Sequence, residues 1–298
     1  MISIEDLEKV YGQAGGQNRF KYLRNKNTGG RNNSKGNTFE NFYAVFKIAQ
    51  LINDNLAGQA RISSQLSCFV DDLIIERLDK NMAQFYQIKD VDRLTWRSGS
   101  SFKIEDDFAM QKAVGDEITL GTKTYLVVSK KDVQKNLKKN FPASISHHTE
   151  IVFFPAAPTI NHMLQVNPGF RSILVDICAI NNPNSDKLEA IAAIILGVWD
   201  GGSKEKVSVE DIVNGCFLMN PNFLKRHAGQ LLKNIESIFM SVKGFSYKVE
   251  HGFISWNYLL TDSGVFQHPI GSPQFIQWEN DIMKLTITTF DELEPYLS

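Results

Sequence analysis

Two short segments decide the fold: "FVDDLIIE" at residues 69–76 and "FYQIKD" at residues 85–90. Both are apolar runs, and "DKN" at 79–81 between them is typical of a turn. They therefore predict a β-hairpin, with strands at about 67–78 and 82–91. Each strand nevertheless carries polar side chains at positions where a strand normally packs against a core.

The alternation of side chains along a strand places Gln87 and Lys89 on one face of the second strand. In the first strand the same alternation sends Asp71 and Asp72 to opposite faces. Alternation alone does not select between the two aspartates, so both remain candidates for a polar group shared with Gln87 and Lys89.

Unpaired charges between the layers of an α/β domain cost several kcal/mol, so these side chains need partners. If Asp72, Gln87 and Lys89 lie at neighbouring strand ends, their polar tips converge. Glu40, arriving from a preceding helix, completes a set of two carboxylates and an amide oxygen that suits Mg²⁺. Such a site with a lysine beside it suits phosphodiester hydrolysis. The alternative is a surface hairpin with an Asp–Lys salt bridge worth less than about 1 kcal/mol.

The flanking sequence predicts a mixed α/β domain over residues 38–160. A helix is expected after Asn37 or Thr38, because aromatic residues follow at helical spacing. The elements expected further along are a helix near 104–114, a strand at 124–129, a lysine-rich helix to about Asn140 and a strand at 150–155. A strand, helix and strand of these lengths favour a parallel right-handed crossover.

Residues 1–37 contain seven basic side chains, and no acidic residue lies between Lys9 and Phe39. With many Asn, Gly and Gln residues, this segment is expected to be a flexible basic arm. Arg31 and Lys35 in the arm, with Lys130 and Lys131 on the lysine-rich helix, are the candidate phosphate contacts. The alternative for both regions is a solvated surface without a partner.

Residues 161–298 are expected to form a mainly helical domain with an assembly or regulatory role. Helix starts are indicated at Asp186, Ser208 and Asn220, where capping residues precede apolar periodic stretches.

Composition limits the function classes. Thirty-two basic and 33 acidic side chains give a net charge of −1, so only a local basic patch could meet nucleic acid. The longest apolar stretch is too short for a bilayer span. Three scattered cysteines, without a CxxC pair, argue against a disulfide framework or zinc site and favour a cytoplasmic setting. Signatures of P-loop NTPases, α/β-hydrolases and zincins are lacking.

Three segments in order, "TFENFYAVFKIAQLI" (38–52), "FVDDLIIE" and "FYQIKD", resemble the PD-(D/E)XK nuclease superfamily. More closely, they resemble the dsDNA endonuclease domain of bacterial antiphage systems of the CBASS and Lamassu types, in which QxK replaces the usual (D/E)XK. The resemblance implies a nuclease core, a mixed sheet flanked by helices. It also implies that Glu40, Asp72, Gln87 and Lys89 are catalytic, with Asp71 as the substitute for Asp72.

The resemblance further implies Mg²⁺ held by Glu40, Asp72 and Gln87, with Mn²⁺ as a substitute. Double-stranded DNA is the implied substrate, and the implied partners are regulatory subunits of a defence complex. Because cutting a duplex favours two sites that act together, a homo-oligomer is expected as the active form. The short apolar stretches predict no membrane association. The alternative is a non-catalytic DNA-binding or scaffold subunit that keeps the nuclease fold. A restriction enzyme with a defined recognition sequence is a third hypothesis.

Overall fold

The computed structural model describes residues 2–31, 37–99, 102–220, 223–225, 231, 233–250 and 252–297. The chain divides into two compact units. Unit 1 contains residues 1–173 and 195–213, whereas unit 2 contains residues 174–194 and 214–298. The division therefore differs from a single boundary after residue 160, because the chain returns to unit 1 after its first passage through unit 2.

Unit 1 is built on a six-stranded mixed sheet in the order β5-β4-β3-β2-β1-β6. Strands β1, β2 and β3 form an antiparallel meander, and β6 pairs antiparallel with β1. The pairs β3–β4 and β4–β5 are parallel, as expected for the crossover. The strands are β1 (Ala60–Ser63), β2 (Leu73–Arg77), β3 (Met82–Lys89), β4 (Gly121–Val128), β5 (Thr149–Phe153) and β6 (Val207–Ser208).

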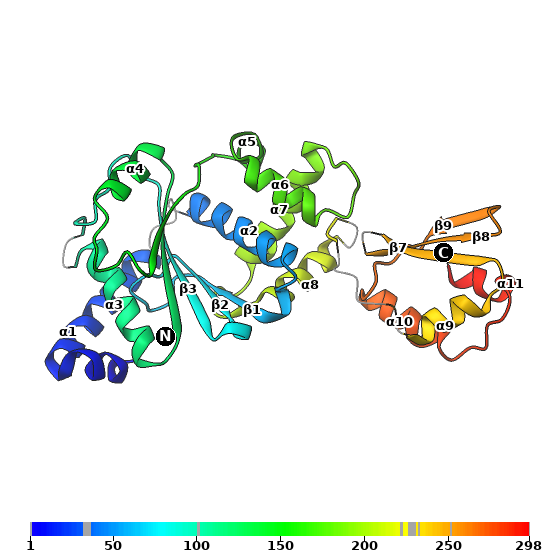
Figure 1. The fold of residues 1–298 in the computed structure, drawn as a ribbon, viewed down its shortest axis with the longest axis horizontal. Coiled ribbons are helices and arrows are strands. Elements are labelled where there is room, and N and C mark those ends of the chain that lie inside the picture. Colours follow the sequence, from blue (N-terminus) through cyan, green and yellow to red (C-terminus); the bar gives the residue numbers. More distant parts are fainter. Residues whose placement is uncertain are drawn as a thin grey trace. The chain divides into compact units, whose positions relative to one another are not determined.

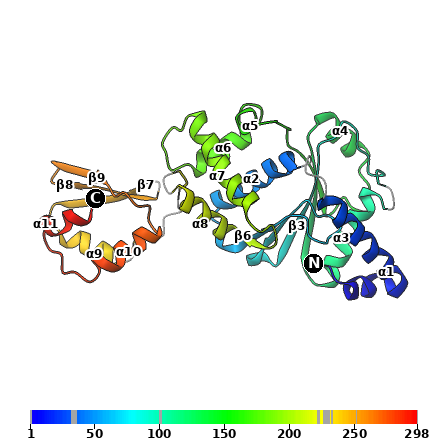
Figure 2. The same ribbon diagram turned by 180° about the vertical axis from the view of Figure 1, so that it is seen from behind.

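Helices cover both faces of this sheet, as Figures 1 and 2 show. On one face lies α2 (Asn37–Asn53), whose Tyr43 ring is 5.6 Å from the Tyr86 ring of β3. On the other face lie α1 (Ile4–Arg31) and α3 (Ile104–Glu117). The apolar core on that side includes Phe85 of β3 and Phe108 of α3. The expected α/β class and the hairpin are confirmed in this sheet.

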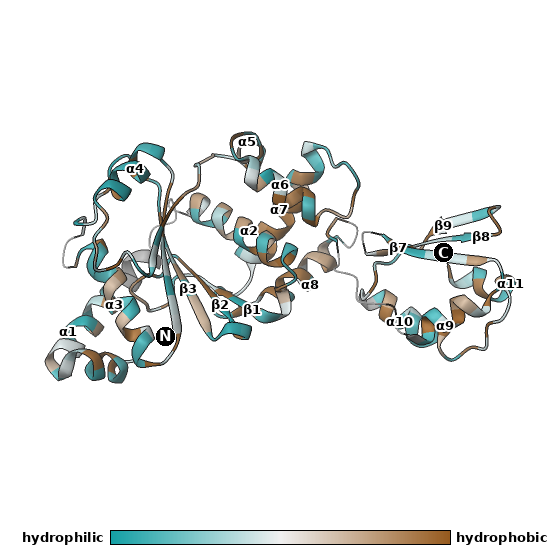
Figure 3. Cartoon of the chain, viewed as in Figure 1, coloured by the Kyte–Doolittle hydropathy of each residue, from teal (hydrophilic) through white to brown (hydrophobic). Residues whose placement is uncertain are grey.

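The helix α4 (Lys131–Lys139) connects β4 to β5 and is mostly hydrophilic in Figure 3. Only Val133 and Leu137 are buried along it. The lysine-rich helix expected from the sequence is therefore present, with a narrow apolar stripe that packs on the sheet. Three more helices begin within unit 1: α5 (Ile160–Val166), α6 (Pro168–Ile177) and α8 (Val209–Met219).

The segment expected to be a flexible arm is instead a helix over residues 4–31, kinked at Gly12. Gly12 has φ 71°, a left-handed value that favours glycine. After the kink, a Cβ on Gly16 would lie 2.7 Å from the backbone nitrogen of Glu8, so only glycine allows this close approach. Leu7 and Leu23 are buried in the core with α3. The polar composition of residues 1–37 gave no indication that these two leucines attach the helix to the core.

Unit 2 contains a second, three-stranded antiparallel sheet in the order β7-β8-β9. Its strands are β7 (Phe245–Glu250), β8 (Phe253–Tyr258) and β9 (Asp262–Val265). The helices are α9 (Lys233–Ser241), α10 (Pro273–Ile282) and the short α11 (Phe290–Leu293), while α7 (Ser185–Gly201) starts in unit 2 and ends in unit 1. Their core is rich in aromatic residues, and Phe239, Phe266 and Phe275 are fully buried. The C-terminal region is thus helical with an added small sheet.

Helices α7 and α8 begin at the positions indicated by the sequence, next to Asp186 and Ser208. The start expected at Asn220 leads into residues 221 and 222, which lie outside the described part of the chain. All three cysteines are buried. None of the helices in the described ranges combines the length and apolar composition that crossing a membrane requires.

The packing of α1 leads to a testable outcome. Replacing Leu23, which is 1% exposed, by Ala is expected to lower the free energy of unfolding by about 2–5 kcal/mol, because it leaves a cavity in the core. The matched change Gln17→Ala, at an exposed position of the same helix, is expected to stay within about 0.5 kcal/mol. Urea denaturation followed by circular dichroism measures both. Equal, negligible effects would mean that the segment is an unattached arm.

Candidate active site

The site is centred on the Asp72 carboxylate, which lies directly before β2. Its Oδ2 atom accepts hydrogen bonds from the Gln87 amide nitrogen at 2.5 Å, the Ile88 backbone N–H at 2.6 Å and the Lys89 Nζ at 3.3 Å. All three donors come from the end of β3. The structure therefore brings Asp72, Gln87 and Lys89 together, as expected from the sequence.

Strand register explains this convergence. The ladder between β2 and β3 ends at the pair Leu73↔Tyr86, so the next position on each strand places Asp72 beside Gln87. Instead of another backbone pair, the Asp72 side chain takes the Ile88 N–H. The choice that alternation left open is settled by register: the hydrogen bonds from Gln87 and Lys89 go to Asp72.

The chain that leads to Asp72 is held by buried polar contacts. The side-chain oxygen of Gln111, which is 2% exposed on α3, accepts from the backbone N–H groups of Phe69 and Val70 at 3.1 and 3.4 Å. The Ser64 hydroxyl donates to the Asp72 carbonyl at 2.9 Å. These contacts fix the backbone at the start of β2 and so position the carboxylate. The sequence offered no signal for Gln111.

Glu40 joins this group from the first turn of α2. Burial raises the pKa of Glu40 to about 7, and the negative charge of Asp72 adds to the rise, whereas Lys89 opposes it. Asp71, which is 8% exposed, also raises this pKa, so both aspartates lie within electrostatic reach of Glu40. Two carboxylates that repel each other form a place where a cation would be stabilising.

The donor set fits a hard divalent cation in composition. Glu40 and Asp72 supply carboxylates and Gln87 an amide, the ligand types that Mg²⁺ prefers. In the described residues, however, no group of three or more His, Cys, Asp or Glu side chains is placed to hold a metal ion. Metal binding through Gln87 would require its amide oxygen, whereas the structure turns the amide nitrogen toward Asp72.

Two cavities meet at Lys89. One, of about 800 Å³, is lined by Thr38, Phe39 and Glu40 at the start of α2 and by residues 156–158. The other, of about 610 Å³, lies between α1, α3 and the end of β3, and Gln87 also lines it. Lys89 is therefore accessible from both sides.

The candidate phosphate contacts are only partly described. Lys130 and Lys131 follow β4 at the sheet edge where β3 also ends, because Lys89 pairs with Val128. Lys130 forms an exposed ion pair with Asp92 at 3.4 Å. Arg31 ends α1, but its side chain, like the whole of Lys35, lies outside the described residues.

Comparison with known proteins gives no further guide: no protein-family model, no curated protein and no solved structure matches this chain.

The raised pKa of Glu40 gives a pH-dependent stability. Because the folded pKa of about 7 exceeds the usual 4.5, the folded state binds more protons between these values, and stability falls as the pH rises through this window. Replacing Glu40 by Gln removes the titrating carboxyl group, and with it the fall in stability as the pH rises. The stability advantage of Glu40→Gln over wild type should therefore grow by about 1–2 kcal/mol from pH 5 to pH 8, after discounting for solvent screening.

Urea denaturation at the two pH values measures this difference. The control is Glu117→Gln, which changes an exposed glutamate at the end of α3. An advantage for Glu40→Gln that is independent of pH would contradict the assigned environment of Glu40.

Proposed function

We propose that this chain is a Mg²⁺-dependent DNA endonuclease of the PD-(D/E)XK type, acting as the nuclease effector of a bacterial antiphage complex. The observation that carries the proposal is the Asp72 carboxylate, which gathers Gln87, Ile88 and Lys89 beside Glu40. Support also comes from the order of elements, in which the helix with Glu40 precedes the strand after Asp72 and the strand with Gln87 and Lys89.

In the proposed reaction, bound Mg²⁺, with Mn²⁺ as a substitute, supplies Lewis-acid polarisation of the phosphoryl group and lowers the pKa of water. Glu40, Asp72 and Gln87 would hold it. Lys89 donates hydrogen bonds to the attacking water or to the phosphoryl oxygens, and its charge stabilises the added negative charge of the transition state. Its Nζ, 3.3 Å from Asp72 Oδ2, is kept near the metal ligands by that same contact.

An active nuclease of this kind requires restraint, and unit 2 is the proposed surface for it. Large apolar side chains are exposed there: Leu218 is 80%, Met240 82% and Leu260 91% exposed. These three side chains are the proposed contacts with other subunits. Regulatory partners would hold the enzyme inactive, and homo-oligomers would pair two sites for cutting both strands of a duplex.

A second candidate function is a non-catalytic DNA-binding subunit. It is favoured by the hydrogen bond from the Gln87 amide nitrogen to Asp72, which turns the amide oxygen away from that carboxylate, and by the neutral residue at position 87.

Replacing Lys89 by Ala is expected to reduce Mg²⁺-dependent plasmid cleavage by at least 100-fold, because the transition state loses its neighbouring positive charge. DNA binding and the melting temperature should change little. The matched control is Lys80→Ala, an exposed lysine in the turn before β3 and at the opposite end of that strand. Gel analysis of cleavage and anisotropy measurements of binding provide the readouts.

Calorimetric titration with Mg²⁺ and Mn²⁺ separates the two candidate functions. The nuclease is expected to bind the metal in a manner that Asp72→Asn abolishes. Unchanged cleavage by Lys89→Ala would refute the assignment, and absence of both metal binding and cleavage would favour the DNA-binding subunit.

Lys130 and Lys131 are proposed to contact phosphates next to the cut bond. The double variant Lys130→Ala/Lys131→Ala is expected to reduce the slope of log K against log salt concentration by about 1–2, because each lost phosphate contact removes about 0.9. The control is Lys80→Ala/Lys123→Ala, which removes two exposed lysines at the other end of the strands. Equal slopes for both double variants would show that α4 does not bind DNA.

A further inference from the structure

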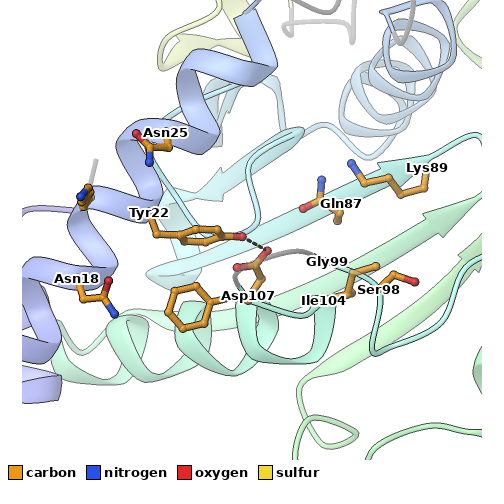
Figure 4. Close-up of a pocket in the computed structure, with 11 residues that line it drawn as sticks. Asn18, Tyr22, Asn25, Gln87, Lys89, Ser98, Gly99, Ile104 and Asp107 are labelled. Carbon is orange, nitrogen blue, oxygen red and sulfur yellow. Dashed lines mark hydrogen bonds between the residues drawn. The ribbon is translucent and has the colours of Figure 1, made fainter.

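The cavity of about 610 Å³ has features that phosphodiester hydrolysis alone does not need. One wall is a single face of α1, where Asn18, Lys21, Tyr22 and Asn25 follow the i, i+3, i+4, i+7 spacing. Figure 4 shows Asn18, Tyr22 and Asn25 on this helix, across from Gln87 and Lys89 on β3. A helix face turned toward its own domain is normally apolar, whereas this one is mostly polar.

Three polar side chains of that face are not held by contacts within the described residues. Asn18, Lys21 and Asn25 are exposed, and within the described part of the chain they make no side-chain hydrogen bond or ion pair. They therefore present amide and ammonium groups to whatever occupies the cavity. Their presence is not explained by the packing of α1, which rests on Leu7 and Leu23.

Tyr22, by contrast, is held firmly. Its hydroxyl donates to the Asp107 carboxylate at 3.1 Å, a group that is 7% exposed on α3. The Tyr22 ring meets the Phe102 ring edge to face at 4.7 Å, and the Arg19 guanidinium lies 5.6 Å from the same Phe102 ring. Two aromatic rings are thus fixed in the wall of a polar cavity that Lys89 also lines.

We propose that this cavity receives one unpaired nucleotide of the DNA strand, next to the bond that is cut at Lys89. This inference rests on the proposed nuclease function. Aromatic rings stack on bases, while amide and carboxylate groups hydrogen bond to base edges. Lys21 at the rim is placed to contact a phosphate. The volume is in the range of sites for single small molecules, which suits one nucleotide and excludes a duplex.

The substrate preference follows from the geometry. A base inside a duplex is stacked and paired, so its face and its pairing edge do not reach Tyr22 or the α1 amides. The nucleotide in the cavity has to come from a single strand, a frayed end or a mismatched pair, because taking a paired base out of the stack costs a few kcal/mol. The cavity thereby favours DNA with unpaired positions over perfect duplex.

The test is fluorescence anisotropy with the full chain in metal-free buffer, where no hydrolysis occurs. The probes are a labelled 12-nucleotide single strand, its perfect duplex and the same duplex with one central mismatch. The single strand and the mismatched duplex are expected to bind at least fivefold more tightly than the perfect duplex. Tyr22→Ala should weaken binding of the single strand about 5- to 100-fold, as expected for a lost stacking contact, and Tyr22→Phe should stay within about twofold.

A second pair of variants guards against misfolding of Tyr22→Ala. Asn18→Ala/Asn25→Ala changes only exposed side chains that line the cavity, and it should weaken single-strand binding several-fold. The matched control Gln13→Ala/Gln17→Ala changes two exposed amides of α1 that do not line it, and should bind as the wild type does.

Three results would overturn the inference: equal affinity for perfect and mismatched duplex, no loss with the cavity variants, or competition by free deoxynucleotides at the concentrations at which the strand binds. The last would indicate a small-molecule site. If the Tyr22 and Asn18/Asn25 variants cleave plasmid as the wild type does, the proposed nuclease function is retained and the proposed nucleotide site is rejected. If single-strand binding depends on Tyr22 but the chain hydrolyses no DNA in the presence of Mg²⁺, the proposed nucleotide site is retained and the proposed nuclease function is rejected.

Discussion

The partly buried carboxylate of Asp72 holds together the candidate site of unit 1. Asp72 stands where the pairing of β2 and β3 stops, and its Oδ2 atom takes the Ile88 N–H that the ladder no longer pairs. A buried backbone N–H without an acceptor would cost about as much as a lost hydrogen bond, so the side chain stabilises the open end of the hairpin. The same atom holds Gln87 and Lys89. The structural role and the candidate chemical role thus share one group.

Glu40 distinguishes this cluster from an ordinary, partly exposed ion pair between Asp72 and Lys89. Burial raises the pKa of Glu40 to about 7, and the negative charge of Asp72 adds to the rise, although the charge of Lys89 opposes it. A purely structural site would gain stability from a neutral residue at position 40. A carboxylate at position 40 would be stabilised by a cation bound between Glu40 and Asp72. Strongly perturbed pKa values of this kind are common at functional sites.

The helix α1 lines one of the two cavities that meet at Lys89, so it contributes to the candidate site. The helix contributes one wall of the cavity that Gln87 and Lys89 also line, and Tyr22 joins it to α3 through Asp107. The helix α1 therefore belongs to the unit that carries the candidate site. In the proposed complex, a DNA strand bound across Lys89 would touch the start of α2 on one side and α1 on the other.

Local patterns in the sequence determined much of this structure. Periodicity alone determined α2, the hairpin of β2 and β3, the crossover through α4, and the shared face of Gln87 and Lys89, because these depend on residues close in the chain. Only tertiary structure decided the rest. Register selected Asp72 over Asp71, long-range pairing created the short strands β1 and β6, and two buried leucines turned a polar, glycine-rich segment into α1. The contact between Tyr22 and Asp107 joins residues 85 positions apart, and no local pattern encodes such a contact.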